Sequence, residues 1–248
     1  MKLHLNSRYE SVRGFFNNLE RNFANGKKIK DGRNTLRVCT YNGVVLNVKR
    51  YHAPRLLQAV VYKFFRQPKA KRAYYNAFRI LEAGVGTPES VAYVELKRFG
   101  LLRESYYVSL QCPYTRRFYE FGEAELTDEV RDIARAFARM TARLHEARLL
   151  HKDYSPGNIL FDRGEDGEWH FSLVDTNRMR QGNVSVKEGC RNFARLWGTP
   201  EFFDVMADEY AEIRNADPAQ CRTWMREARK KFWTRYIRRH GEKFHIRF

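Results

Sequence analysis

The sequence predicts an α+β protein of two lobes, with strands in its first half and helices in its second. Residues 36–51 form two β-branched or alternating runs around Asn42-Gly43, a dipeptide typical of tight hairpins. From Thr127 onward, apolar residues recur every three or four positions, the period of an amphipathic helix. A chain of 248 residues is long enough to give such a protein a substantial core.

Apolar residues at helical spacing predict three helices in the first half. One is a short helix within the first 26 residues that ends near Gly26, and the others cover residues 54–66 and 69–82. Beyond the third helix, the runs at residues 91–98 and 106–111 predict a second hairpin.

The second half is expected to begin with a long helix, capped by Thr127 and ending at residues 145–149. A short strand pair should follow, over residues 158–161 and 170–174, around a polar turn. The remainder has a mostly helical pattern. The change in pattern places the boundary between the lobes at residues 112–122.

Positive charge is concentrated in two regions of a chain whose formal net charge is +17. Residues 32–81 contain eleven Lys or Arg and no acid, and residues 222–248 carry a net +8. A solvated basic face with no partner is the alternative interpretation, but segregation this strong favours an anionic partner such as phosphates or a membrane surface. No nucleic-acid-binding motif is present, so nucleic acid is not expected as a partner.

The four cysteines lie far apart, which argues against a disulfide framework or a zinc site and favours a reducing cytoplasm. No stretch approaches the roughly 20 apolar residues of a membrane span, and no secretory signal opens the chain.

The segment most informative about chemistry runs from His151 to residue 160. It places Asp153 and Asn158 five residues apart, and Asp175 ends the second predicted strand, 17 residues beyond Asn158. Magnesium-dependent phosphoryl transfer needs such a set: one carboxylate to orient the attacking hydroxyl, and an amide oxygen with a second carboxylate to hold Mg²⁺. A strand lysine must also reach the nucleotide phosphates, and Lys49 is the candidate.

These elements, in the order H-x-D-x-x-x-x-N and then V-D, resemble the protein-kinase-like superfamily. The resemblance implies that Asp153 is the catalytic-loop aspartate and His151 the histidine that braces this loop. It also implies that Asn158 and Asp175 are the metal ligands and Lys49 the phosphate lysine. It further implies a β-rich N-lobe and a shortened helical C-lobe.

Within the superfamily, the sequence looks most like the lipopolysaccharide core kinases, the Kdo/heptose kinase group of Gram-negative bacteria. The resemblance covers roughly residues 28–200. It rests on the loop Asp-Tyr-Ser-Pro-Gly-Asn, the turn Asp31-Gly-Arg-Asn-Thr-Leu36, the segment Gly84-Val-Gly-Thr-Pro88 and the replacement of Asp-Phe-Gly by Asp175-Thr-Asn. The expected organisation is a helical extension over residues 1–27, an N-lobe over 28–114, and a C-lobe with a basic tail over 115–248.

Two further ATP-binding elements are expected from the same resemblance. Gly32, Arg33 and Asn34 are candidates for the phosphate-covering loop, although a plain hairpin turn explains them equally well. Cys112 and Tyr114 flank the candidate hinge that would bind adenine through its backbone, with an ordinary lobe linker as the alternative.

The sequence also departs from the kinase pattern. No acid occurs near Ala73, where a kinase places the glutamate that pairs with the strand lysine, and Glu82 is the first acid after that position. No Ala-Pro-Glu motif follows Asp175, which argues against a regulated protein kinase. Asn192 stands where kinases often have an acid that braces the catalytic loop, but a solvated helix face is the favoured interpretation. His145 is expected to be a packed helix-end histidine.

The expected function is ATP- and Mg²⁺-dependent phosphorylation of a Kdo or heptose hydroxyl in the lipopolysaccharide inner core. The acceptor would be lipid-linked, and the enzyme would sit peripherally on the anionic cytoplasmic face of the inner membrane. Alternatives are a soluble aminoglycoside-type or atypical protein kinase, and a pseudokinase that binds an anionic ligand. The sequence identifies neither the particular sugar nor the oligomeric state.

Overall fold

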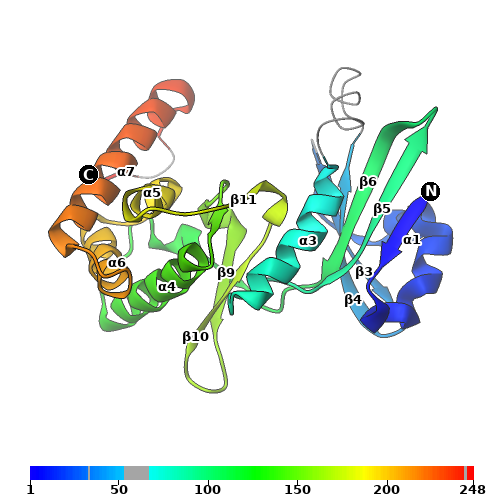
Figure 1. Ribbon diagram of the computed structural model, residues 1–248, viewed down its shortest axis with the longest axis horizontal. Coiled ribbons are helices and arrows are strands. Elements are labelled where there is room, and N and C mark those ends of the chain that lie inside the picture. The colour runs from blue at the N-terminus through cyan, green and yellow to red at the C-terminus, as the bar shows by residue number, and fades with distance from the viewer. Residues whose placement is uncertain (33, 53–66, 243–244) are drawn as a thin grey trace. The chain divides into compact units, whose positions relative to one another are not determined.

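The computed structural model describes residues 1–32, 34–52, 67–242 and 245–248, which form two compact units (Figure 1). Unit 1 comprises Met1–Arg79 and Pro88–Pro113, and unit 2 comprises Ile80–Thr87 and Tyr114–Phe248. The helix expected over residues 54–66 and the candidate residue Arg33 lie outside the described residues. The division into a strand-rich and a helix-rich unit confirms the expected α+β class.

Unit 1 is built on one six-stranded antiparallel sheet with the order β1-β5-β6-β4-β3-β2. Its strands are β1 (Lys2–Leu5), β2 (Lys27–Lys30), β3 (Asn34–Tyr41), β4 (Val44–Tyr51), β5 (Ser90–Arg98) and β6 (Leu101–Leu110). Both expected hairpins are confirmed. Asn42 and Gly43 have φ values of 46° and 75°, which fit the tight turn joining β3 and β4. The second hairpin also turns through two residues, Phe99 and Gly100, so β6 begins earlier than expected.

Residues before β2 include the expected short helix that ends near Gly26, but they also contain a strand that was not expected. They form strand β1, a 3₁₀ segment η1 (Ser7–Asn18) and the short helix α1 (Leu19–Asn25). Strand β1 extends the sheet because Lys2–Leu5 alternate in polarity, the period of a strand. Phe15, Phe16 and Phe23 are buried in the core of unit 1 with residues of β4 and β6.

Helix α3 (Lys69–Glu82) confirms the expectation for that segment. Its Ala70 and Tyr74 pack against Tyr51 and Tyr93 of the sheet. The helix ends where Gly84 takes a left-handed φ of 67° and Val85 donates its backbone N–H to the carbonyl of Ile80.

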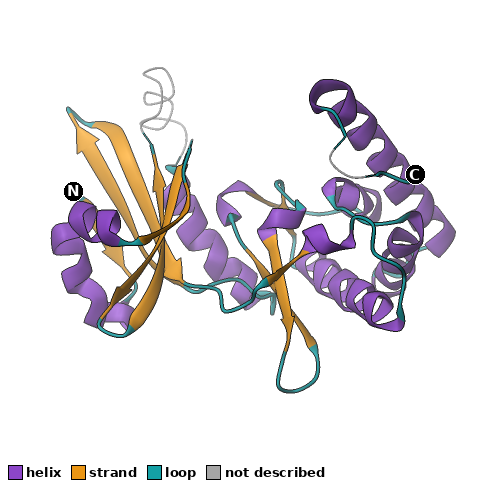
Figure 2. Ribbon diagram, turned by 180° about the vertical axis from the view of Figure 1, so that it is seen from behind, coloured by secondary structure: helices purple, strands orange, loops and turns teal. Residues whose placement is uncertain are grey.

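Unit 2 contains most of the described helical residues, and its strands are two to five residues long; Figure 2 distinguishes helices from strands by colour. Its α-helices are α4 (Asp128–Glu146), α5 (Val186–Asn192), α6 (Pro200–Ile213) and α7 (Pro218–His240). Its strands are β7 (Arg116–Arg117), β8 (Leu149–His151), β9 (Ile159–Arg163), β10 (Trp169–Leu173) and β11 (Met179–Gln181). Its 3₁₀ turns are η2 (Phe118–Phe121), η3 (Pro156–Asn158), η4 (Thr176–Arg178) and η5 (Phe193–Arg195). Thr127 caps α4 as expected, since its hydroxyl accepts from the Val130 N–H at 3.3 Å.

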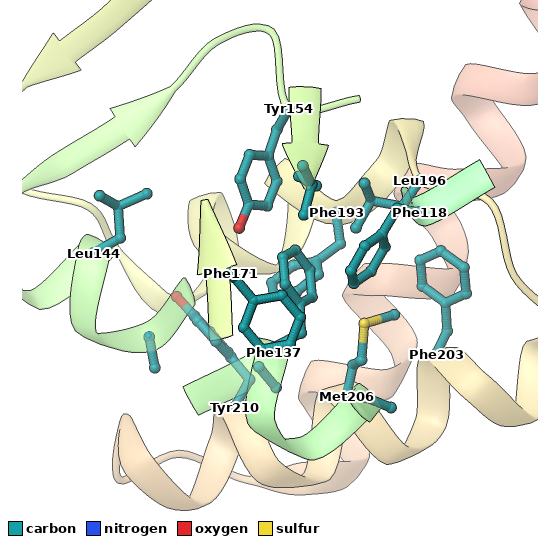
Figure 3. Close-up of a cluster of buried hydrophobic side chains, with 14 of the residues drawn as sticks. Phe118, Phe137, Leu144, Tyr154, Phe171, Phe193, Leu196, Phe203, Met206 and Tyr210 are labelled. Carbon is teal, nitrogen blue, oxygen red and sulfur yellow. The ribbon is translucent and has the colours of Figure 1, made fainter. Parts of the chain in front are cut away.

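Aromatic side chains dominate the core of unit 2 (Figure 3). The rings of Phe118 and Phe137 have centroids 4.1 Å apart. Tyr154, from the loop that carries the candidate base, is buried against this core, and its hydroxyl is 2.6 Å from that of Thr141 on α4. The core therefore holds the loop in place.

Candidate active site

His151 lies at the end of β8 and connects two segments that carry candidate site residues. Its Nδ1 accepts the backbone N–H of Asp153 at 3.2 Å, and its Nε2 lies 3.1 Å from the carbonyl oxygen of Val174. A carbonyl can only accept, so the geometry requires a neutral ring with its proton on Nε2. Burial lowers the pKa of His151, which stabilises this neutral form. His151 thus fixes the backbone at Asp153 relative to the residue before Asp175.

A chain of hydrogen bonds that begins at the backbone carbonyl of His151 holds this residue in place. Asn192 donates its side-chain N–H to the His151 carbonyl at 3.1 Å, and its Oδ1 lies 3.1 Å from Nε2 of His145. The His145 Nδ1 is 2.9 Å from the hydroxyl of Tyr210, which accepts in turn from Arg214 at 2.6 Å. Burial lowers the pKa of His145 to about 4, so this ring is also neutral.

These contacts correct one expectation and confirm another. Asn192 does not lie on a solvated helix face, because both ends of its amide bond to buried partners. His145 is 1% exposed in the last turn of α4, as expected for a packed helix-end histidine.

Asn158 and Asp175 lie at the same end of the β9–β10 hairpin. Val174 donates its N–H to the Asn158 carbonyl at 3.0 Å, which extends the pairing of the two strands. The Asn158 Nδ2 donates to the Asp153 carbonyl at 2.8 Å, so its Oδ1 is the side-chain atom suited to a cation. An amide oxygen and a carboxylate are hard donors that fit Mg²⁺, which usually binds one or two carboxylates together with substrate phosphates.

Asp175 itself has a left-handed backbone, with φ 58° and ψ 43°. This conformation is uncommon for a residue with a side chain and is concentrated at functional sites. The carboxylate accepts a hydrogen bond from the side chain of Asn177.

The segment 84–87 fixes the strand that leads to Asp175. Leu173 donates its N–H to the Gly86 carbonyl at 2.8 Å, and the Thr87 hydroxyl donates to the Leu173 carbonyl at 2.7 Å. A Cβ at Gly86 would lie 2.0 Å from the carbonyl oxygen of Phe171, so only glycine allows this approach. The Gly-Val-Gly-Thr-Pro segment therefore has a structural reason for its second glycine.

Two arginines contact the carboxylate of Asp153, and the sequence reasoning missed both in this role. Arg195, at the end of η5, bonds to Oδ1, and Arg178 lies 3.7 Å from Oδ2. Asp153 is 20% exposed in its side chain and so remains accessible to a ligand. Arg195 is 42 residues from Asp153 in the sequence, and no local pattern links the two.

The expected phosphate-binding residues of unit 1 lie on strands β3 and β4 and in the turn before β3. Gly32 belongs to the turn between β2 and β3, and Asn34 opens β3 and pairs with Tyr51 of β4. Lys49 pairs with Leu36 of β3, and its ammonium group lies 5.3 Å from the centroid of the Tyr51 ring.

The candidate hinge residues stand on either side of the division between the units. Cys112 is buried in unit 1, and its carbonyl accepts from the Gln111 side chain at 3.1 Å. Tyr114 is the first residue of the second segment of unit 2. His151, Asp153, Asn158 and Asp175 are brought together within unit 2, whereas Lys49, Gly32 and Asn34 belong to unit 1.

Among the residues that the structure describes, no group of three or more His, Cys, Asp or Glu side chains is arranged to hold a metal ion. Asn158 and Asp175 are only two residues, one of them an amide, so a site that they make is not such a group. No helix within the described ranges combines the length and the apolar character that a membrane span requires.

The fold is that of the protein-kinase-like class. The model of the Lipopolysaccharide kinase (Kdo/WaaP) family matches residues 27–204, so the chain belongs to that family. Its members are kinases, phosphotransferases that act on sugar hydroxyls. The chain resembles a solved structure described as WaaP in complex with acyl carrier protein, with a TM-score of 0.65 and 19% identity, over 94% of this chain and 100% of that one. A search of curated protein sequences found no match.

Proposed function

We propose that the protein transfers the γ-phosphoryl group of ATP to a Kdo or heptose hydroxyl in the lipopolysaccharide inner core, in a Mg²⁺-dependent reaction. One observation supports this most: Asp153, Asn158 and Asp175 are joined through His151 and the β9–β10 hairpin in a chain of this family. Phosphoryl transfer depends mainly on positioning and charge stabilisation, and such a rigid constellation is suited to both.

In this mechanism, Asp153 accepts a hydrogen bond from the acceptor hydroxyl and takes its proton as the oxygen attacks the γ-phosphorus. The bond between the γ-phosphorus and the β–γ bridging oxygen breaks, and ADP leaves. Arg195 and Arg178 hold the carboxylate in one orientation and add positive charge beside the transferred group. Asn158 and Asp175 would hold Mg²⁺, which when bound neutralises charge on the phosphates.

Residues of unit 1, together with Tyr114 at the start of the second segment of unit 2, would bind the nucleotide. Lys49 would contact the α- and β-phosphates, the turn containing Gly32, Arg33 and Asn34 would cover them, and the backbone at Cys112 and Tyr114 would receive adenine. His151 has a positioning role, because both of its ring nitrogens are engaged by backbone groups.

The charge of the chain supports a lipid-linked acceptor at the cytoplasmic face of the inner membrane. Basic residues attract anionic headgroups by about 1 kcal/mol each near the surface. A net charge of +17 exceeds what one nucleotide requires, so we propose peripheral attachment to that membrane.

The test is to incubate the protein with Mg·ATP and purified core glycans and to locate new phosphate by mass spectrometry. Asp153→Asn and Asp175→Asn should each lower turnover by at least about 100-fold, the usual contribution of a positioned base or metal ligand. Asp166→Asn is the matched control, because Asp166 is an exposed acid in the β9–β10 turn of the same unit. Melting temperatures of all variants establish that they are folded.

Other results would contradict the proposal. Sugar phosphorylation by Asp153→Asn at the wild-type rate would remove Asp153 as the base. Phosphate found on protein or on an aminoglycoside, with none on the core glycan, would identify a protein kinase or a small-molecule kinase. Failure of Mg·ATP to stabilise the protein against heat, together with no ATP consumption, would identify a pseudokinase.

A further inference from the structure

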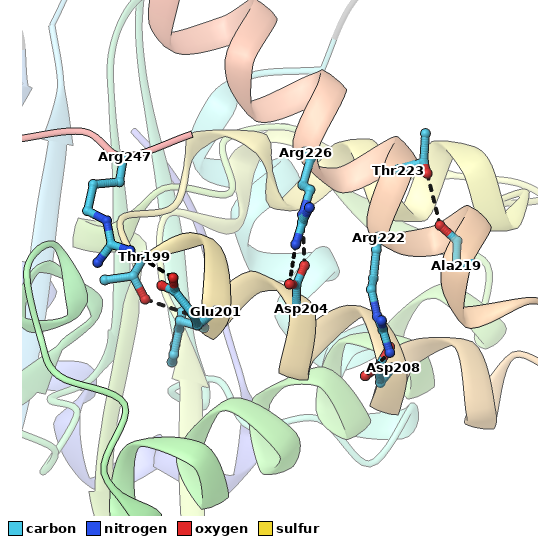
Figure 4. A network of polar contacts seen from close by, with 10 residues as sticks. Thr199, Glu201, Asp204, Asp208, Ala219, Arg222, Thr223, Arg226 and Arg247 are labelled. Carbon is cyan, nitrogen blue, oxygen red and sulfur yellow. Dashed lines mark hydrogen bonds and ion pairs between the residues drawn. The ribbon is translucent and has the colours of Figure 1, made fainter.

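One face of α7 uses its arginines in ion pairs with α6 (Figure 4). Arg222 contacts both carboxylate oxygens of Asp208, with distances of 2.5 and 2.7 Å, and Arg226 contacts both oxygens of Asp204. These two-point contacts fix the rotation of the helix about its axis.

A buried arginine fixes the same helix further along. Arg229 is 2% exposed, donates to the Gly198 carbonyl at 2.5 Å and also bonds to the carbonyl of Arg247. Burial lowers the pKa of Arg229 to about 10. These contacts therefore fix the orientation of α7, and with it the direction in which the side chains on its opposite face point.

That other face carries a row of cations. Lys231, Arg235 and Arg239 follow one another at intervals of four residues, and Arg191 of α5 faces the same space. All four are exposed, and among the residues that the structure describes none of them has an ion-pair partner. Like charges four residues apart on a helix repel each other. The helix dipole favours Arg239 in the last turn of α7, but this effect does not extend to Lys231 two turns earlier.

The space that these cations surround is a groove with an aromatic wall. Its volume is about 600 Å³, which is within the range of small-ligand sites. Phe232 and Tyr236 are half-buried there, and their stacked rings have centroids 6.1 Å apart. The His240 ring packs against that of Tyr236, with 4.8 Å between the centroids. We call this the basic groove. Its lining is Arg191, Ala194, Glu227, Ala228, Lys231, Phe232, Arg235, Tyr236, Arg239 and His240.

The basic groove lies next to the candidate base. Arg195, whose guanidinium bonds to Asp153, lies with its central carbon 5.7 Å from the centroid of the Phe232 ring. The side chain of Arg195 therefore lies between Phe232, in the wall of the groove, and the Asp153 carboxylate, which is expected to receive the acceptor hydroxyl. Both features belong to unit 2.

We propose that the basic groove binds a phosphate or carboxylate group of the sugar acceptor and places a neighbouring sugar hydroxyl at Asp153. This inference rests on the proposed function and assigns the acceptor side of its site. Arginines bind such groups through paired N–H donors, and aromatic rings offer apolar faces to the C–H surfaces of sugars.

A glycan suits the basic groove better than a bilayer headgroup. The groove is concave, whereas a helix that lies in the membrane interface presents exposed apolar side chains beside its cations. Within the described part of the chain, the large apolar side chains with the greatest exposure lie outside the groove. They are Met1, Ile29, Val45, Leu81, Phe99, Tyr119 and Phe248.

The experiment compares two double variants that each remove two charges from α7. Arg235→Gln with Arg239→Gln alters the basic groove. Lys230→Gln with Arg238→Gln is the control, because these exposed residues of the same helix do not line it. Steady-state kinetics use delipidated core oligosaccharide as acceptor, first intact, then treated with phosphatase, then with its carboxylates reduced. Binding of the intact oligosaccharide without ATP is measured by calorimetry.

We expect the groove variant to raise the acceptor KM about tenfold or more over the control, with a smaller change in kcat. The difference should shrink on the acceptor that lacks the recognised anion, which identifies phosphate or carboxylate. Equal acceptor KM values for the two variants would overturn the inference and leave the proposed function intact. The inference would also be overturned if the groove variant were impaired only in its binding to phosphatidylglycerol vesicles, because the groove would then bind the membrane.

The proposed function can fail separately. If the wild type phosphorylates no glycan, calorimetric binding of the intact oligosaccharide still tests the role of the basic groove. Weaker oligosaccharide binding by the groove variant than by the control supports it, and equal binding overturns it.

Discussion

The side-chain amide of Asn192 donates a hydrogen bond to the backbone carbonyl of His151 at 3.1 Å and so connects α5 to the strand that precedes Asp153. In this chain of contacts, Arg214 donates to the Tyr210 hydroxyl, Tyr210 donates to His145, and His145 donates to the Asn192 side-chain oxygen. Every donor in the chain therefore faces an acceptor, up to the His151 carbonyl. A fully satisfied buried network of this kind stabilises one geometry of the loop.

Asn192→Ala should destabilise unit 2 by about 1–3 kcal/mol, because it leaves the His151 carbonyl and the His145 Nε2–H without partners. We expect kcat to fall more than the KM for ATP changes, since the loop carries the candidate base. Urea unfolding followed by tryptophan fluorescence measures the stability, because all four tryptophans lie in unit 2. Asn17→Ala, at an exposed position of unit 1, is the control. Equal stability of the two variants would contradict the role of the network.

Stability should fall as the pH decreases from about 6.5 to about 4 because of His145. The buried ring has a pKa of about 4, whereas an unfolded histidine titrates near 6.5, so the unfolded state binds more protons in this window. The contribution of His145 is complete above pH 6.5 and is lost as the pH falls, by up to about 3 kcal/mol. The lowered pKa of His151 acts in the same direction.

This pH dependence can be measured from urea midpoints at pH 7.5 and pH 5. His145→Gln removes the titrating group, so its stability should change less between these two values than that of the wild type. Identical slopes for the two proteins would exclude His145 as the origin.

Arg195→Ala should lower kcat by about tenfold or more, because misplacement of a catalytic group by 1 Å costs up to about 100-fold in rate. The guanidinium bonds to Oδ1 of Asp153, and its removal leaves that carboxylate with more freedom. Arg195→Lys should recover part of the loss, and Arg135→Ala, in an exposed ion pair on α4, should have no effect on kcat. A normal kcat for Arg195→Ala would show that Asp153 needs no such support.

Gly86→Ala should destabilise unit 2 by about 1–3 kcal/mol or more, because the new Cβ would collide with the Phe171 carbonyl. We also expect a loss of kcat, since β10 leads to Asp175. Gly43→Ala is a useful comparison: its Cβ meets no atom within 4 Å, and its cost of about 1 kcal/mol comes from the left-handed backbone alone. Thermal unfolding and turnover of both variants test the difference. Wild-type kcat in Gly86→Ala would mean that the strand can shift without consequence.

Local patterns sufficed for much of the fold. The dipeptide Asn42-Gly43 predicted its hairpin, and Thr127 predicted the start of α4, because turns and caps depend on residues close in the sequence. Strand β1 was missed: a four-residue alternation is too short to distinguish from a loop until β5 lies beside it. Asn192 was misjudged for a related reason, since its partners are 41 and 47 residues away.

The sequence by itself determined the family and the set of candidate residues, because the spacings between His151, Asp153, Asn158 and Asp175 along the chain resemble those of that family. Only the tertiary structure decided how that set is held. The tautomer of His151, the arginines at Asp153 and the separation of the α7 cations into a paired face and a basic groove all depend on contacts between distant segments. Such contacts arise from packing and burial, which no local pattern encodes.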